Sequence, residues 1–194
     1  MCHNFLHDAS CYEQLMQRDE QIAAEVQAKG CPYCGGVLHR SDYARKPRGV
    51  PRSLLGPGYE SRFSFCCARE GCRRRTTPAS VRFLGRRVYL GVMVVLHSML
   101  SGGERRERCQ ANRSGQASER TLQRWRQWWR GQFVESRFWQ QARARLSPPV
   151  CDHTLPGSVL ERFTGATLAQ RVSQLLHWLS PITGVTASDT LKTV

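Results

Sequence analysis

Lysine and acidic residues are scarce in this chain of 194 residues. Only 15 residues are Asp or Glu, against 29 that are Lys or Arg, which gives a formal net charge of +14. Lysine occurs only at Lys29, Lys46 and Lys192, so almost all of the positive charge is arginine. The planar arginine side chain can bind phosphate or guanine through two hydrogen bonds at once, which favours a nucleic acid as partner.

Long apolar runs are also missing. A membrane-spanning helix needs roughly 20 apolar residues, and the most apolar run, Leu90 to Leu100, is too short. The N-terminus has no basic segment followed by an apolar one, which is the pattern of a secretion signal. We therefore expect no membrane partner and a cytoplasmic, nucleoid-associated protein of a prokaryote.

Recognisable catalytic patterns are absent as well. There is no glycine-rich phosphate loop, no pair of carboxylates, and no set of Ser, His and Asp that can be assigned to a triad. Cys151 precedes Asp152 and His153, but neighbours in sequence do not make a triad, and a linker is the simpler interpretation. We expect no enzymatic activity.

The positive charge is concentrated in the middle of the chain. Residues 40–145 contain 24 basic and 7 acidic residues, whereas residues 1–39 sum to −3 and residues 146–194 to zero. A basic middle between weakly charged ends is typical of a protein that binds a polyanion. A GC-rich genome would explain part of the preference for Arg over Lys, but it would not explain this clustering.

Two groups of cysteines in the first half have the spacing of a metal site. The chain has nine cysteines, and without a secretion signal an odd number favours metal ligation over disulfides. Cys31 and Cys34 are followed by two glycines, and the second group consists of Cys66, Cys67 and Cys72. Four thiolates in a tetrahedron are a usual shell for structural zinc. The sequence predicts one structural zinc ion held by Cys31, Cys34, Cys67 and Cys72.

Spacing alone does not decide one of the four ligands, because either Cys66 or Cys67 can be the partner of Cys72. We favour Cys67, since an aromatic residue commonly stands two positions before the first cysteine of such a pair, as Phe65 does here. Cys66 would then pack inwards. It remains the alternative ligand.

Residue patterns predict an α+β fold, with a small four-cysteine zinc ribbon followed by a helix-turn-helix or three-helix unit and by C-terminal helices. Helical spacing of apolar residues predicts a helix over residues 10–28, which Gly30 ends. A stripe from Leu168 to Leu179 predicts a helix near the C-terminus. The expected parts are an N-terminal helix in residues 1–30, a zinc ribbon in 31–84, a helix-turn-helix region in 85–146, and a C-terminal helical segment with a frayed tail in 147–194.

Residues 87–133 have the pattern of a three-helix DNA-binding unit. A buried apolar helix precedes a short charged helix from Glu104 to Asn112, and Ser118 is a good N-cap for a third helix. Trp125 and Trp129 lie on the apolar stripe of that helix and are expected to pack. The third helix either continues to about Leu146 or breaks and restarts near Glu135. A plain helical bundle with a solvated arginine face is the alternative.

Arginine and glutamine near the start of the third helix are the residue types that read guanine and adenine edges in the major groove. These candidates are Arg120, Gln123, Arg124 and Gln127. Arginines outside this helix are candidates for contacts with phosphate. They are Arg73, Arg74, Arg75, Arg86 and Arg87.

The cysteine groups followed by the helical region resemble the N-terminal part of bacterial insertion-sequence transposases. The resemblance covers about residues 31–133 and rests on three strings: Cys31-Pro-Tyr-Cys34-Gly-Gly, Phe65-Cys66-Cys67 with Cys72 and three arginines, and Ser118-Glu-Arg-Thr-Leu-Gln-Arg-Trp125. It implies a zinc ribbon and a helix-turn-helix that binds the ends of a mobile element through Arg120, Gln123 and Arg124. Such transposases also carry three carboxylates on a ribonuclease-H-like core. The roughly 60 residues after residue 133 hold only four acidic residues, so we expect no such core here.

The sequence thus predicts a non-catalytic, zinc-dependent protein that binds double-stranded DNA and is associated with a mobile element. In this hypothesis the C-terminal helices recruit a transposase or recombinase, or form a homodimer. Two other functions fit the same motifs. One is a transcriptional regulator of a host promoter, and the other is an adaptor whose ribbon binds protein and whose basic face binds RNA.

Overall fold

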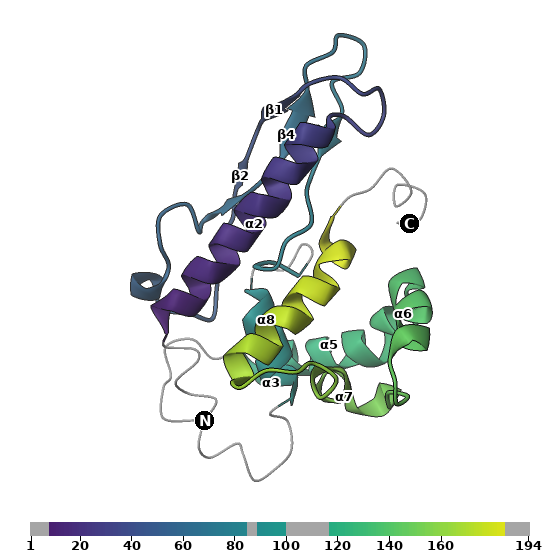
Figure 1. The fold of residues 1–194 in the computed structure, drawn as a ribbon. Coiled ribbons are helices and arrows are strands. Elements are labelled where there is room, and N and C mark those ends of the chain that lie inside the picture. Colours follow the sequence, from purple (N-terminus) through teal and green to yellow (C-terminus); the bar gives the residue numbers. More distant parts are fainter. Residues whose placement is uncertain (1–7, 85–88, 100–116, 185–194) are drawn as a thin grey trace.

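The computed structural model describes residues 8–84, 89–99 and 117–184 (Figure 1). The short helix expected at Glu104–Asn112 lies outside these ranges, as do Arg86, Arg87 and the tail after residue 184. Within the described ranges, no helix combines the length and the apolar character needed to cross a membrane.

The longest element is the N-terminal helix α2 (Ala9–Lys29). Asp8 caps its start, where the carboxylate accepts a hydrogen bond from the backbone N–H of Ser10 at 2.9 Å. Gly30 ends it with a φ of 76°, a left-handed conformation that glycine adopts without steric cost. The helix predicted over residues 10–28 is therefore confirmed.

Two small antiparallel sheets lie along α2 (Figure 1). The first has the order β1-β4-β5, and Leu38 lies opposite Cys67. The second pairs β2 with β3. The strands are β1 (Leu38–Arg40), β2 (Tyr43–Ala44), β3 (Ser61–Arg62), β4 (Phe65–Cys67) and β5 (Arg75–Thr76). Together with the helices, these sheets confirm an α+β fold.

The remaining elements are helical. The α-helices are α3 (Gly91–Met99), α5 (Glu119–Trp128), α6 (Arg137–Ala142), α7 (Gly157–Leu160) and α8 (Leu168–Leu179). A π-helix (Trp129–Phe133) continues α5, and short 3-10 turns cover Arg52–Leu54, Arg143–Arg145, Asp152–Thr154 and Ser180–Thr183. Thus the helix that Ser118 caps breaks before residue 136, close to the predicted break near Glu135.

Two apolar clusters hold these elements together. The smaller one lies between α2 and the first sheet and contains Ala23, Leu38 and Phe65 as well as Cys31 and Cys67. The larger one joins α3, α5, α6 and α8. Four α8 residues are fully buried in it: Val172, Leu175, Leu176 and Leu179. The C-terminal segment is therefore part of the main core.

The segment of residues 78–84 connects the sheets to α3 and is tied to both ends of the chain. The backbone N–H of Ser80 donates a hydrogen bond to Oγ1 of Thr183 at 2.7 Å. The hydroxyl of Ser80 donates another to Asp19 in α2 at 2.5 Å. All three residues are buried, so these bonds fix the N-terminal helix, the connecting segment and the C-terminal turn relative to one another.

Candidate metal centre and basic surfaces

Four cysteine sulfurs gather beyond the C-terminal end of α2. The Sγ atoms of Cys31, Cys34, Cys67 and Cys72 all lie within 4.8 Å of one another. Sγ of Cys31 is 3.8 Å from that of Cys72, and Sγ of Cys34 is 3.5 Å from that of Cys67. A disulfide bond is only about 2.05 Å long, so the sulfurs are not bonded to each other. The predicted grouping of these four cysteines is confirmed.

The first pair is held by a tight turn directly after α2. The backbone N–H of Gly35 donates to the carbonyl of Cys31, and the N–H of Cys31 donates to the carbonyl of Gly36, both at 2.8 Å. A Cβ atom at Gly36 would lie 3.2 Å from Sγ of Cys67 and 3.3 Å from Sγ of Cys34. A side chain at this position would crowd the sulfurs, which glycine avoids.

The second pair comes from β4 and the turn that follows it. The N–H of Cys67 donates to the carbonyl of Arg74 at 3.0 Å, and the N–H of Cys72 donates to that of Arg69 at 3.1 Å. Neighbouring residues of a strand face opposite sides of the sheet. Cys67 is buried toward the cluster, whereas Cys66 lies opposite Arg75 on the outer face. The cluster thus contains Cys67, as favoured above, and not Cys66. The expectation that Cys66 packs inwards is wrong, because alternation along β4 puts it half-buried on the face opposite to Cys67.

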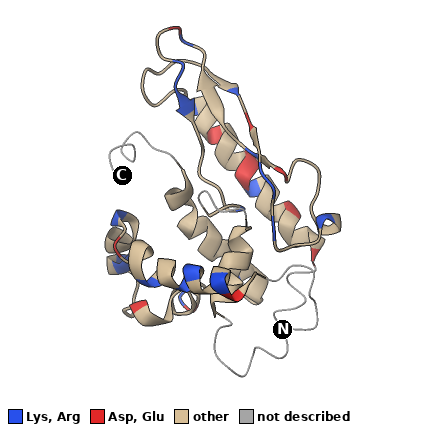
Figure 2. Cartoon of the chain, turned by 180° about the vertical axis from the view of Figure 1, so that it is seen from behind, with Lys and Arg blue, Asp and Glu red and all other residues tan. Residues whose placement is uncertain are grey.

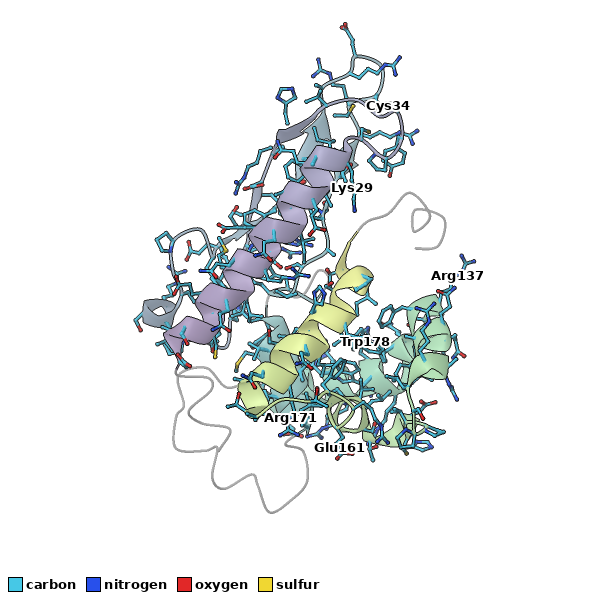
Figure 3. All side chains as sticks on the ribbon, viewed as in Figure 1. Lys29, Cys34, Arg137, Glu161, Arg171 and Trp178 are labelled. Atoms are coloured by element: carbon cyan, nitrogen blue, oxygen red, sulfur yellow. The ribbon has the colours of Figure 1, made fainter. Side chains whose placement is uncertain are left out.

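The four thiols differ in environment. Cys31 and Cys67 are buried, while Cys34 and Cys72 are partly exposed. A hydrogen bond from the backbone of Gly36, and then one from Cys67, lower the pKa of Cys34 to about 7. Burial raises the pKa of Cys67 to about 12. Thiolates are the form that binds metal ions, and Cys34 becomes one more readily than Cys67 does. Figure 3 shows Cys34 near Lys29 at one end of the molecule.

Comparison with family models, with curated proteins and with solved structures gives no match to this chain. The functional inference therefore rests on the chain's own residues.

A second candidate site is the exposed face of α5. Ser118 caps this helix and its side chain accepts a hydrogen bond from the N–H of Thr121 at 3.4 Å. Four side chains share one exposed face, since each is three or four residues from two others of the set, and Figure 2 shows positive charge along α5. They are Arg120, Gln123, Arg124 and Gln127. All four side chains are exposed, and neither arginine forms an ion pair with a residue that the structure describes.

Aromatic packing fixes the opposite face of α5. The ring of Trp125 meets that of Tyr89 edge-on, with centroids 5.0 Å apart. Nε1 of Trp129 donates a hydrogen bond to the hydroxyl of Ser98 in α3 at 3.1 Å. The prediction that Trp125 and Trp129 pack in the core is confirmed. The polar face of α5 is therefore held on a rigid support.

The three consecutive arginines after Cys72 have different surroundings. Arg75 donates hydrogen bonds to the carbonyl and hydroxyl of Ser41 and to the hydroxyl of Ser64. The guanidinium of Arg74 lies over the ring of Tyr33 at 4.5 Å from its centroid. Arg73 is exposed. The guanidinium of Arg75 is thus engaged by Ser41 and Ser64, so Arg73 and Arg74 are the better candidates for contacts with phosphate in this run.

Other exposed arginines were not singled out by the sequence pattern. Arg69 lies in the turn of the second cysteine pair, Arg130 lies in the π-helix that continues α5, and Arg137 and Arg145 lie in α6 and the 3-10 turn that follows it. Charge runs mark residues 73–75 and 86–87, and helical spacing marks the third helix, but neither signal marks these four positions. Exposure at these four positions depends on how the elements pack, for which the sequence carries no direct signal.

Proposed function

We propose that this chain is a zinc-dependent, non-catalytic DNA-binding protein associated with a bacterial mobile element, acting in the cytoplasm on the nucleoid. The observation that carries this proposal is the arginine and glutamine face of α5. The motifs of residues 31–133 resemble the N-terminal part of insertion-sequence transposases, and this resemblance supports the link to a mobile element.

Zinc is the metal that best suits the cysteine cluster. With a Zn–S distance of about 2.3 Å, the sulfurs of a tetrahedral site are about 3.8 Å apart. The separations of 3.8 Å between Cys31 and Cys72 and of 3.5 Å between Cys34 and Cys67 are close to that value. Four thiolates complete the shell of the ion and leave no position for a substrate, so the role of the metal is structural. Cys31, Cys34, Cys67 and Cys72 would hold it.

Double-stranded DNA is the polymer that best suits α5. The major groove is about 12 Å wide and admits an α-helix. Arginine pairs with guanine and glutamine with adenine through two hydrogen bonds each. The Arg120, Gln123, Arg124 and Gln127 face offers both residue types, and the packed tryptophans hold the helix while it is in the groove.

Binding measurements separate this function from an RNA-binding adaptor. A fluorescein-labelled duplex of mixed sequence and a single-stranded RNA of equal length would be titrated with zinc-loaded protein and followed by anisotropy. We expect tighter binding to the duplex, and weaker binding after zinc is removed with a chelator. Equal affinity for the RNA would favour the adaptor, and no binding to the duplex would contradict the proposal.

Selection of genomic fragments by the protein separates a mobile-element protein from a host regulator. Enrichment of the ends of a mobile element supports the proposal. Enrichment of host promoters favours the regulator instead.

A further inference from the structure

The end of the molecule that holds the cysteine cluster carries a basic surface of its own. This surface, called here the metal tip, consists of Tyr33, Val37, Arg69, Arg73 and Arg74. Figure 1 shows it at the far end from α5 and α6, and Figure 2 shows Lys and Arg at this end as well as on α5. The two surfaces are thus separate.

Contacts around the cysteines bring the residues of the metal tip together. Nη1 of Arg69 donates a hydrogen bond to the carbonyl of Cys34 at 3.4 Å. The N–H of Arg73 donates to the carbonyl of Arg69 at 3.2 Å, and Arg74 stacks on Tyr33, which lies between the first two cysteines. These arginines are all exposed. Their arrangement therefore depends on the metal centre beneath them.

The backbone at Arg73 is strained. Its φ is 44°, in the left-handed region that favours glycine, and Arg73 is the only described non-glycine residue with a positive φ. Non-glycine residues in this region are uncommon, and they cluster at functional sites. The conformation places an arginine at the outer edge of the metal tip, where a glycine would fit the backbone better.

The metal tip also exposes an apolar side chain. The side chain of Val37 is 69% exposed. Among the described residues, it is the only large hydrophobic side chain that is exposed to solvent. The backbone of Val37 lies next to the turn that carries Arg69, because its carbonyl accepts a hydrogen bond from the N–H of Ala68 at 2.9 Å. One acidic residue, Glu70, lies in the same turn, so the net charge of the tip stays positive. An exposed apolar side chain close in the fold to basic residues complements a groove bordered by phosphates.

The length of α2 sets the scale of the separation. Its 21 residues span about 30 Å, since each residue of an α-helix adds about 1.5 Å. The metal tip lies at its C-terminal end, and the core that supports α5 includes Tyr12 and Leu15 near its N-terminal end. One turn of B-DNA is about 34 Å. A duplex that reaches both surfaces is thus at least about one turn long.

We propose that the metal tip is a second DNA contact, independent of sequence, on the same duplex that α5 reads. The proposal rests on the proposed function of α5. Arg69, Arg73 and Arg74 contact phosphates, and Val37 packs against the sugar edges of the groove between them. The zinc centre then shapes a binding surface as well as holding the ribbon.

Salt dependence tests this proposal. Each phosphate contact contributes about 0.9 to the slope of log affinity against log salt concentration. Between 50 and 200 mM salt the wild-type protein should therefore lose roughly tenfold more affinity for a 24-bp duplex than R69A/R73A loses. The charge-preserving variant R69K/R73K should keep the wild-type slope. V37S should weaken binding by the same factor at both salt concentrations and leave the slope unchanged.

The outcomes distinguish the two proposals. Native mass spectrometry of each variant with one bound zinc shows that the tip is intact. On a 6-bp hairpin duplex, about 20 Å long and too short to reach both surfaces, the affinities of wild type and R69A/R73A should differ much less than on the 24-bp duplex. If R69A/R73A binds the 24-bp duplex with the wild-type affinity and slope, the second contact does not exist, while α5 retains its role. If the wild-type protein binds no duplex, the proposed function itself fails.

Discussion

The carboxylate of Asp19 accepts a hydrogen bond from Nε of Arg82 at 2.7 Å, and neither side chain is exposed to solvent. The other carboxylate oxygen accepts from the N–H of Val81 at 2.6 Å. The carbonyl of Arg82 in turn accepts from the N–H of Gly91, the first residue of α3, at 2.7 Å. This pair therefore connects α2, which carries the cysteine cluster, with the helix that supports α5.

Removing the charge of Asp19 should destabilise the protein strongly. D19N leaves the buried guanidinium of Arg82 without a counter-ion, and breaking a buried pair in this way costs about 3–5 kcal/mol. Urea denaturation would measure the free energy of unfolding. D152N is the matched control, because its pair with Arg143 is exposed at 3.3 Å and should contribute less than about 1 kcal/mol. Equal losses in the two variants would contradict the role of the buried pair.

Single cysteine substitutions should separate the metal ligands from their neighbour. C31S, C34S, C67S and C72S each remove one sulfur of the cluster and should reduce or abolish zinc binding. C66S should keep one zinc ion per chain, because Cys66 lies on the outer face of the sheet. Native mass spectrometry gives the stoichiometry directly. Loss of zinc in C66S with zinc retained in C67S would reverse the assignment.

The C-terminal helix should be needed for stability. Leu175 is fully buried between α8 and the rest of the core. L175A leaves a cavity, which costs about 2–5 kcal/mol for a buried leucine. The exposed Gln174 offers the control Q174A, which should change the free energy of unfolding by less than about 0.5 kcal/mol. A small effect of L175A would show that α8 is not packed as described.

Histidine burial should make stability depend on pH. Burial lowers the pKa of His97 below its ordinary value of 6.5, so the folded protein holds this side chain neutral. As the pH falls through 6.5, the unfolded chain takes up a proton that the folded chain does not, and the free energy of unfolding decreases. In urea denaturation at about pH 7.5 and about pH 5.5, H97Q should lose less stability on acidification than wild type. Identical losses would exclude His97 as a source of the pH dependence.

Local patterns were enough to predict several parts of the structure. The span of α2 followed from apolar spacing and Gly30, the start of the third helix from Ser118, and the cysteine cluster from two short spacings and their glycines. Each of these features depends on residues that are close in sequence. The choice of Cys67 over Cys66 also followed from local order, through Phe65.

Features that depend on long-range packing were not predicted. Arg62 and Arg82 belong to the basic middle of the chain, yet both are buried, and Arg62 donates hydrogen bonds to the carbonyls of Pro78 and Thr183. Asp19 likewise looks like a surface residue of an amphipathic helix. Only the contact between α2, the connecting segment and the C-terminal turn puts these charges inside.

The central claim is that the exposed face of α5 reads DNA. The most direct test is to measure how tightly variants of this face bind a duplex that the wild-type protein has selected. R120A/R124A would be compared with K46A/R52A, which removes the same charge from exposed positions outside α5. An arginine that reads a base contributes about 1–3 kcal/mol. R120A/R124A should therefore bind about 30-fold more weakly or worse, with K46A/R52A close to wild type. Equal affinities of R120A/R124A and K46A/R52A would contradict the account.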